Sequence, residues 1–174
     1  MNITIPLPLL EAASVCTVNK NRLRPYLTGV VLIDGYIVAT DSERLFYCPH
    51  SSLDQFKDQL IIPVKTIESI LKQFSRGRFN PYMIKSAHIF NENNEYHIVV
   101  DKTGIDEIFT PISSKFPSEW KRVIPIDDGM QYKGTIPHFN WKHMVDFQKI
   151  NKILGAINPV DTYLKPTGTD SAAH

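Results

Sequence analysis

The sequence has 174 residues, a net charge of +1, 43% hydrophobic residues and no long run of like charge. These values are typical of a globular chain and exclude a disordered or fibrous one. No apolar run approaches the roughly 20 residues of a membrane-spanning helix. The amino terminus also lacks the basic region of a signal peptide, so we expect a soluble, cytoplasmic protein with no membrane partner.

A short strand-like run, a proline and an amphipathic stretch follow one another three times, around Pro6, Pro63 and Pro137. Proline has no N–H for a sheet, but its φ angle suits the first turn of a helix. Each Ile-Pro pair therefore predicts a change from strand to helix, and the three copies predict a repeated unit.

The first unit is predicted to contain one helix, over Leu7–Asn19, and four strands. Asp34-Gly35 lies between two apolar β-rich runs and is a strong hairpin signal. A polar loop is expected at 50–59. The predicted strands cover 3–5, 29–33, 36–40 and 44–48.

The second unit repeats this order. A helix is predicted over Val64–Phe74, ended by Gly77, with a hairpin loop at 91–95. The predicted strands cover 60–62, 82–90, 96–100 and 107–112. Residues 1 to about 125 thus contain two βαβββ halves, and a pseudo-twofold pair of halves would place its two helices side by side on one face of the sheets.

The third unit begins at Gly134, after a linker at 127–129, and its helix is predicted over Asn140–Leu154. Gly155 ends this helix, and only a short strand at 160–164 and a polar tail follow. We therefore predict an α+β fold with a first domain at 1–126, built of halves 1–55 and 56–126. Residues 127–174 would form a partial second domain.

Four segments together resemble the central domain of the bacterial sliding clamp, the β subunit of DNA polymerase III. They are Leu27-Thr28-Gly29-Val30-Val31-Leu32, Val38-Ala39-Thr40-Asp41-Ser42-Glu43-Arg44-Leu45, Leu60-Ile61-Ile62-Pro63-Val64-Lys65 and Phe116-Pro117-Ser118-Glu119-Trp120-Lys121-Arg122-Val123-Ile124-Pro125. Their order and spacing agree with the family over residues 3–125. The resemblance implies the DNA-clamp fold, in which pairs of βαβββ halves form a ring with helices inside and sheets outside.

The resemblance also implies a non-catalytic homo-oligomer that surrounds double-stranded DNA and tethers replication proteins such as a polymerase or a clamp loader. A protein that slides should hold phosphates rather than base edges. The basic residues on or near the three helices are then the candidate DNA contacts: Lys20, Arg22, Arg24, Lys65, Lys72, Arg76, Arg78, Lys142, Lys149 and Lys152. Each of them would otherwise belong to an ordinary solvated helix face.

A pocket for partner peptides is the second site that the resemblance implies. Its apolar side chains would form a floor and its two arginines would anchor a peptide. Matched by motif, the pocket residues are Leu27, Thr40, Arg44, Leu45, Pro117, Arg122 and Val123. The alternative reading is that Leu27, Leu45 and Val123 are plain core residues.

The sequence departs from the family in three places. Ser42-Glu43 replaces a Gly-His pair, the exit segment has one extra residue between Pro117 and Arg122, and the chain is much shorter than a three-domain clamp subunit. Three interpretations stay open. The chain is a short, phage-encoded relative that assembles from more copies, a fragment, or a clamp-fold mimic that binds and inhibits replication or defence proteins without encircling DNA.

Sequence patterns for catalysis or metal binding are missing. The two cysteines, Cys16 and Cys48, fit neither a disulfide framework nor a zinc site, and the six histidines have no metal-ligand spacing. Asp41 and Glu43 could form a carboxylate pair, but a turn hydrogen bond is the simpler role for Asp41. We expect no enzyme, no metal and no cofactor.

Overall fold

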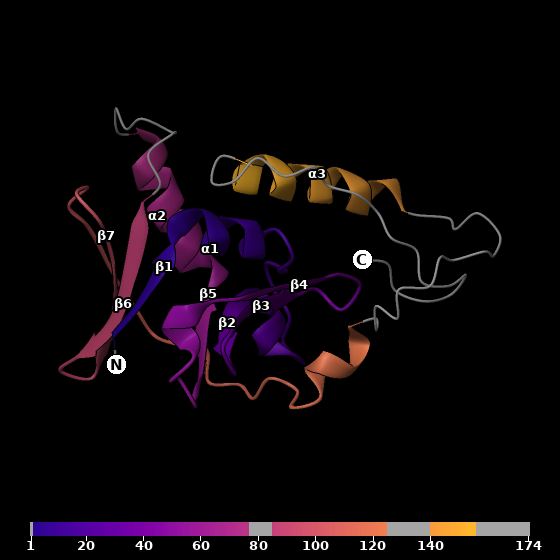
Figure 1. The fold of residues 1–174 in the computed structure, drawn as a ribbon, viewed down its shortest axis with the longest axis horizontal. Helices are drawn as coiled ribbons and strands as arrows, with labels where there is room; N and C mark the ends of the chain where they lie inside the picture. Colours follow the sequence, from indigo (N-terminus) through magenta and orange to yellow (C-terminus); the bar gives the residue numbers. More distant parts are fainter. Residues whose placement is uncertain (1, 77–84, 125–139, 156–174) are drawn as a thin grey trace.

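The computed structural model describes residues 2–76, 85–124 and 140–155, with side chains up to 73 in the first range. Two four-stranded antiparallel sheets and three α-helices make up the described part of the chain (Figure 1). None of the helices in these ranges is long and apolar enough to cross a membrane.

Each sheet combines three strands of one half with the first strand of the other half. The β6 sheet has the order β1 (Asn2–Pro6), β6 (Ser86–Glu92), β7 (Glu95–Val100) and β8 (Ile105–Phe109). The β2 sheet has the order β5 (Gln59–Pro63), β2 (Gly29–Ile33), β3 (Tyr36–Thr40) and β4 (Leu45–Pro49). Because β1 pairs with β6 as β5 pairs with β2, the two halves are related by a pseudo-twofold exchange of strands.

The first two helices follow their strands directly. α1 (Leu7–Ser14) begins after Pro6, and α2 (Val64–Arg76) begins after Pro63, as the Ile-Pro pairs predicted. α1 and α2 contact each other, and both contact the sheets. The predicted α+β fold of two βαβββ halves is therefore confirmed, while Pro137 lies outside the described residues.

α1 is shorter than predicted, since it ends at Ser14 rather than at Asn19. Ser14 Oγ donates to the carbonyl of Glu11 at 2.7 Å, and Thr17 Oγ1 donates to the carbonyl of Ser14 at 2.8 Å. These hydroxyls offer the helix carbonyls local partners that compete with further helical hydrogen bonds. Val18 N then donates to Leu27 O at 2.9 Å, which leads the chain toward β2.

Three predicted strand and loop boundaries also change. Arg44 lies in a turn, so β4 begins at Leu45, and β8 covers 105–109 instead of 107–112. After β8 the chain crosses to the other sheet, where Ile112 N donates to Ile61 O at 3.0 Å. The polar loop predicted at 50–59 contains a short 3-10 helix, η2 (Ser51–Leu53), whose Leu53 is fully buried.

Both predicted hairpin turns are confirmed by backbone angles. Asp34 and Gly35 have φ of 51° and 85°, and Asn93 and Asn94 have φ of 51° and 67°. Two consecutive residues with positive φ are the mark of the tight turns that join adjacent antiparallel strands, and Asn, Asp and Gly adopt them at the lowest cost.

The β2 sheet is buried on both faces. Val30, Leu32 and Ile37 belong to the main core, which also contains Leu10 of α1 and Ile67 of α2. On the opposite face, Val31, Val38 and Ile61 pack against Phe116 and Trp120. This double burial explains why β2 is apolar at every position after Gly29.

α3 (Trp141–Gly155) agrees with the helix predicted in the third unit and lies across α1 (Figure 1). Its Ile150 is 8% exposed and belongs to the main core, against which Phe147, Ile153 and Leu154 also pack. The predicted opening strand near Gly134, the strand at 160–164 and the linker lie outside the described residues. The division into domains near residue 126 stays a prediction.

Candidate functional site

The turn between β3 and β4 is built around Asp41. Its Oδ1 accepts hydrogen bonds from the backbone N–H groups of Glu43, at 3.0 Å, and Arg44, at 2.7 Å. The turn hydrogen bond expected of Asp41 is thus confirmed. Thr40 Oγ1 donates to the carbonyl of Arg44 at 2.6 Å and accepts from Ser42 N at 3.1 Å. Ser42 has φ of 79°, which explains why glycine suits this place in the motif.

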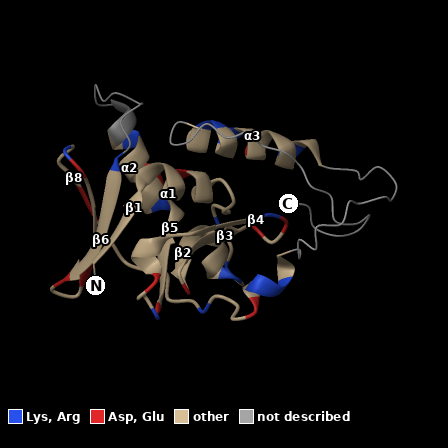
Figure 2. Cartoon of the chain, viewed as in Figure 1, with Lys and Arg blue, Asp and Glu red and all other residues tan. Residues whose placement is uncertain are grey.

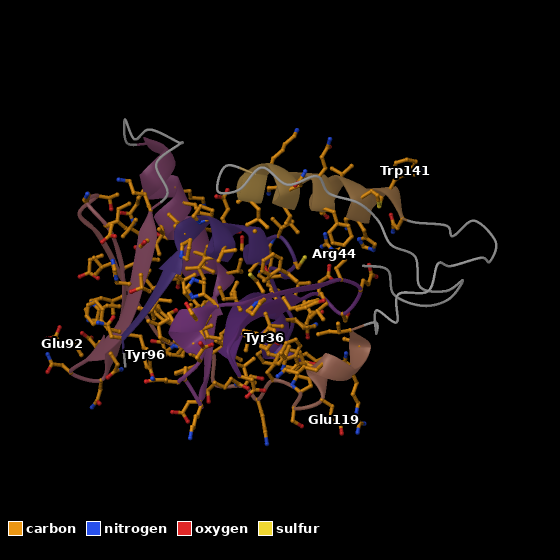
Figure 3. All side chains as sticks on the ribbon, viewed as in Figure 1. Tyr36, Arg44, Glu92, Tyr96, Glu119 and Trp141 are labelled. Atoms are coloured by element: carbon orange, nitrogen blue, oxygen red, sulfur yellow. The ribbon has the colours of Figure 1, made fainter. Side chains whose placement is uncertain are left out.

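Arg44 joins this turn to α3. Asp41 Oδ2 accepts from Arg44 Nε at 2.9 Å and from Nη2 at 2.6 Å, and Arg44 Nη1 donates to Asp146 of α3. Next to this pair, His143 Nε2 lies 3.1 Å from Glu43 Oε2. The Arg44 side chain is only 8% exposed, and Figure 3 shows it between α3 and the strands. Two contacts, each between a basic and an acidic side chain, therefore hold α3 to the turn.

The hydrogen bonds of the turn shift two pKa values. Burial alone would raise the pKa of the Asp41 carboxyl, but the hydrogen bonds from Arg44 and Glu43 outweigh it and hold this pKa below its usual range. Burial alone would lower the pKa of Arg44, but the hydrogen bond and charge of Asp41 raise it. Both groups are charged at neutral pH, so the turn is held by a partly buried ion pair.

The predicted pocket residues occupy different environments. Leu27 is buried, while Pro117 and Val123 are exposed, Val123 to 62%. Leu45 packs on the outer cluster of Phe116 and Trp120. The structure thus brings Leu45 to the exit segment. The two arginines are already paired, Arg44 with Asp41 and Asp146, and Arg122 with Glu119 at 2.7 Å.

Aromatic residues of the exit segment were missed as site candidates, although the motif contained them. Trp120, in the 3-10 helix η3 (Trp120–Val123), has its ring 5.4 Å from that of Tyr36, edge to face. Lys121 Nζ lies 4.8 Å from the centre of the Tyr36 ring. This arrangement covers the outer face of the β2 sheet and places Val123 and Arg122 beside it.

The candidate DNA contacts lie mostly on exposed surface. Lys65 and Lys72 are exposed on α2, Lys142, Lys149 and Lys152 are exposed on α3, and Lys20, Arg22 and Arg24 are exposed in the loop after α1. Arg78 and the side chain of Arg76 lie outside the described part. Figure 2 shows basic segments on α2, α3 and η3, so the structure does not gather all these residues on one element.

α3 has the most uniform basic surface of the three helices. Asp146 is its single acidic residue, and this side chain binds Arg44. The exposed side therefore carries three lysines and no carboxylate, together with Trp141, which is 81% exposed and directed away from the sheets in Figure 3. Lys149 also lies near Glu11 of α1. Burial raises the pKa of Glu11, and the charge of Lys149 lowers it in part.

The residues that the structure describes contain no group of three or more His, Cys, Asp or Glu side chains placed to hold a metal ion. Cys16 is buried near Arg44, and its burial raises the pKa of the thiol to about 11. This thiol is therefore protonated at neutral pH and packs as an apolar group.

Comparison with solved structures finds sliding clamps. The DNA polymerase III subunit beta of Pseudomonas aeruginosa has 23% identity and a TM-score of 0.51, over 72% of this chain and 34% of that chain. The corresponding subunit of Thermotoga maritima has 14% identity and a TM-score of 0.52, over 72% and 34%. A clamp of Bartonella birtlesii bound to griselimycin has 21% identity and a TM-score of 0.51, over 72% and 35%.

This chain thus spans about a third of the length of the solved structures that it matches. Comparisons with protein-family models and with curated proteins gave no match. The similarity to these structures confirms the resemblance to sliding clamps read from the sequence. The described residues therefore have the fold of a bacterial DNA polymerase III beta sliding clamp, over about a third of the length of those subunits.

Proposed function

We propose that this protein is a clamp-like tether, without catalytic activity, that binds duplex DNA independently of sequence and recruits replication proteins. The observation that carries the proposal is the exposed side of α3, which presents Lys142, Lys149 and Lys152 with no carboxylate among them. Lysines on a surface without carboxylates bind phosphates and release counterions from DNA, which needs no base contact. The charge of Lys149 is offset in part by Glu11 of α1, so Lys142 and Lys152 are proposed to carry most of this contact.

The helix layer gives these lysines a suitable place. α1 carries Glu11 as its only charged residue and lies under α3, so α1 offers no basic surface of its own. If the helices line the inside of a ring, α3 would face the DNA instead of α1. The beginning of α2, which carries Lys65, would face it as well. The tether is proposed to act as an assembly of several copies, as the resemblance to ring-forming clamps implies.

Salt-dependent binding of a duplex oligonucleotide tests the DNA contact. The charge-reversal variant Lys142→Glu/Lys152→Glu should bind more weakly, and the slope of log K against log salt should fall by about 2, since each lost phosphate contact removes about 0.9. Lys149 is left unchanged because it lies near Glu11 and its reversal would put two carboxylates together.

The matched control is Lys57→Glu/Lys115→Glu, which reverses two exposed lysines that lie on neither α2 nor α3. This variant should keep the affinity and the salt slope of the parent. Absence of duplex binding at low salt, or equal binding by both double variants, would show that α3 does not contact DNA.

Partner recruitment is proposed to use the region around Leu45, where Pro117, Arg122 and Val123 lie at the surface of the exit segment. The packing of Leu45 against the cluster that contains Trp120 supports an apolar part for this site. A Leu45→Ala variant should bind a polymerase-tail peptide of the same organism's replication machinery less tightly than the parent. Equal binding would refute this site.

The second candidate is a clamp-fold protein that binds replication or defence proteins without encircling DNA. It is favoured by the position of α3, which covers α1 and contacts the β3–β4 turn through the Arg44–Asp146 ion pair and the His143–Glu43 contact. Light scattering separates the candidates: a stable monomer with no salt-sensitive DNA binding supports this one, and a multimer that binds duplex supports the tether.

A further inference from the structure

The seat of α3 includes α1 and the β3–β4 turn, which α3 contacts. Leu9 of α1, Val15 just after α1 and Phe46 of β4 are partly buried around the main core, and α3 adds Phe147 and Ile150 to the same cluster. Ile150 is the one buried residue among those described in α3, whereas Val145 is 62% exposed. The apolar contact of α3 is therefore a single narrow seam.

An ion pair, Arg44–Asp146, and an imidazole–carboxylate contact, His143–Glu43, add specificity to this seam. His143 and Asp146 are three residues apart and so lie on the same side of α3. On the turn, His143 meets the acidic residue Glu43, and Asp146 meets the basic residue Arg44, which follows Glu43 in the chain. A helix seated in the opposite direction would bring like charges together, so the pairs select one orientation.

Glu43, which departs from the clamp motif, has a partner in this contact. The motif has histidine at this position, and here the carboxylate of Glu43 meets the imidazole of His143. A histidine at 43 would face His143 instead. The change of charge type at position 43 is thus matched by a residue of α3.

Arg44 is oriented without help from α3. Asp41 holds Nε and Nη2 of the guanidinium, which leaves Nη1 directed at Asp146. Because Asp41 belongs to the same turn, this arrangement persists when α3 leaves. Arg44 then offers a preorganised donor to another carboxylate, and such donors bind acids at a reduced entropic cost.

We propose that α3 is a releasable internal ligand of this seat, and that an amphipathic helix of a partner protein takes the seat when α3 leaves. The partner helix is defined by the chemistry that α3 now supplies: a carboxylate for Arg44, followed by bulky apolar residues at the positions of Phe147, Ile150 and Leu154. The inference deepens the proposed partner recruitment and rests on it, since α3 would regulate access to Arg44.

Hydrogen exchange of the α3 backbone tests release. The Asp146→Asn variant removes one charged partner of Arg44, so protection of residues 141–155 should fall by about tenfold while β2 and β3 keep theirs. The control Asp106→Asn makes the same substitution at a carboxylate that lies 3.2 Å from the His97 imidazole on the β6 sheet, and it should leave α3 protection unchanged. Unchanged protection in Asp146→Asn overturns the proposal.

A charge exchange separates the contact from general destabilisation. Glu43→Lys, at a side chain that is 70% exposed, should also loosen α3, and Glu43→Lys/His143→Glu should restore its protection by pairing the two sites with reversed signs. A double variant no better protected than Glu43→Lys alone contradicts the pairing.

A labelled peptide of residues 141–155 is the probe for the seat. Binding to the parent should be weak because the tethered α3 competes at high effective concentration, and binding to the Asp146→Asn protein should be about tenfold tighter. The same peptide carrying Asp146→Asn should lose that gain. If neither peptide binds the released protein, the seat does not take a second helix.

These readouts need no DNA. A protein that releases α3 and binds the peptide but never binds duplex supports the inference and overturns the tether. A protein that binds duplex but never releases α3 supports the tether and overturns the inference. The failures of the two proposals can therefore be told apart.

Discussion

At the scale of single residues, Asp41 organises more of the site than any other side chain. Its two carboxylate oxygens accept from the backbone of Glu43 and Arg44 and from the Arg44 guanidinium. The same guanidinium then reaches a helix that lies 102 residues further along the chain. One turn carboxylate thereby sets the geometry of a long-range contact.

The lowered pKa of Asp41 predicts how stability depends on pH. In the unfolded chain this carboxyl has a pKa of about 3.9, and in the folded protein the pKa lies lower, so the unfolded state binds the proton more readily. The stabilisation is complete above that unfolded value and is lost as the pH falls through the folded value. Asp41→Asn should lower the free energy of unfolding by about 2 kcal/mol at pH 7.

Urea denaturation at several pH values checks this prediction. The difference between the parent and Asp41→Asn should shrink as the pH falls below about 4, because the unfolded parent then binds a proton more readily than the folded one. Asp58→Asn, at an exposed side chain, serves as the control and should differ little from the parent. A difference of equal size at pH 3 and pH 7 would mean that ionisation of Asp41 does not stabilise the fold.

Residue patterns predicted one side of this site and missed the other. Thr40, Asp41 and Arg44 are close in sequence and belong to a motif, so they could be identified. His143 and Asp146 lie on a helix whose periodicity shows that one side is apolar but says nothing about which turn that side meets. Contacts between distant segments depend on the packing of the whole chain and leave no local pattern.

At the scale of elements, strands were predicted best where a turn fixed their ends. The strands at 29–33 and 36–40 have the predicted bounds because Asp34-Gly35 allows one hairpin geometry. α1 was predicted too long because the hydroxyls of Ser14 and Thr17 were not counted as competitors for its carbonyls. β8 was displaced because the chain after it joins the other sheet.

Gly29 shows how closely β2 and β5 approach. A Cβ at this position would lie 2.6 Å from Ile62 O, 2.8 Å from Ile61 Cγ2 and 3.0 Å from Ile112 Cδ1. Ile62 O is a backbone atom that cannot move without separating the strands, so Gly29→Ala should lower the free energy of unfolding by about 2 kcal/mol. Thermal or urea denaturation measures this loss.

Gly155→Ala is the matched control, because no atom lies within 4 Å of the corresponding Cβ position. It should leave stability unchanged or raise it slightly, since alanine favours helix. If Gly29→Ala proves as stable as Gly155→Ala, then β2 and β5 do not pack at the distance described.

At the scale of the whole molecule, the exchange of β1 and β5 makes the two sheets one cooperative unit. A single core contains Ile5, Ile89 and Ile98 of the β6 sheet together with Val30 and Leu32 of the β2 sheet. Neither predicted half, 1–55 or 56–126, holds a complete sheet, because each lends its first strand to the other. We therefore expect one unfolding transition for the described sheets.

Two probes check that expectation. In a Trp141→Phe background, Trp120 fluorescence reports the outer face of the β2 sheet, and far-ultraviolet circular dichroism reports all helices and strands. Their urea midpoints should coincide. Two separated midpoints would mean that the sheets unfold independently, and a separate loss of α3 would show as a change in dichroism alone.

The pairing of β1 with β6 also has a consequence for the order of folding. β2, β3, β4 and β5 are consecutive in the chain and can form their sheet early, whereas Thr4 meets His88, 84 residues later. Ile3 and Ile5, both buried in the final sheet, must wait without a partner until β6 has been synthesised. The amino-terminal strand is made first but cannot be among the first to pair, which lengthens the time during which a growing chain exposes an aggregation-prone edge.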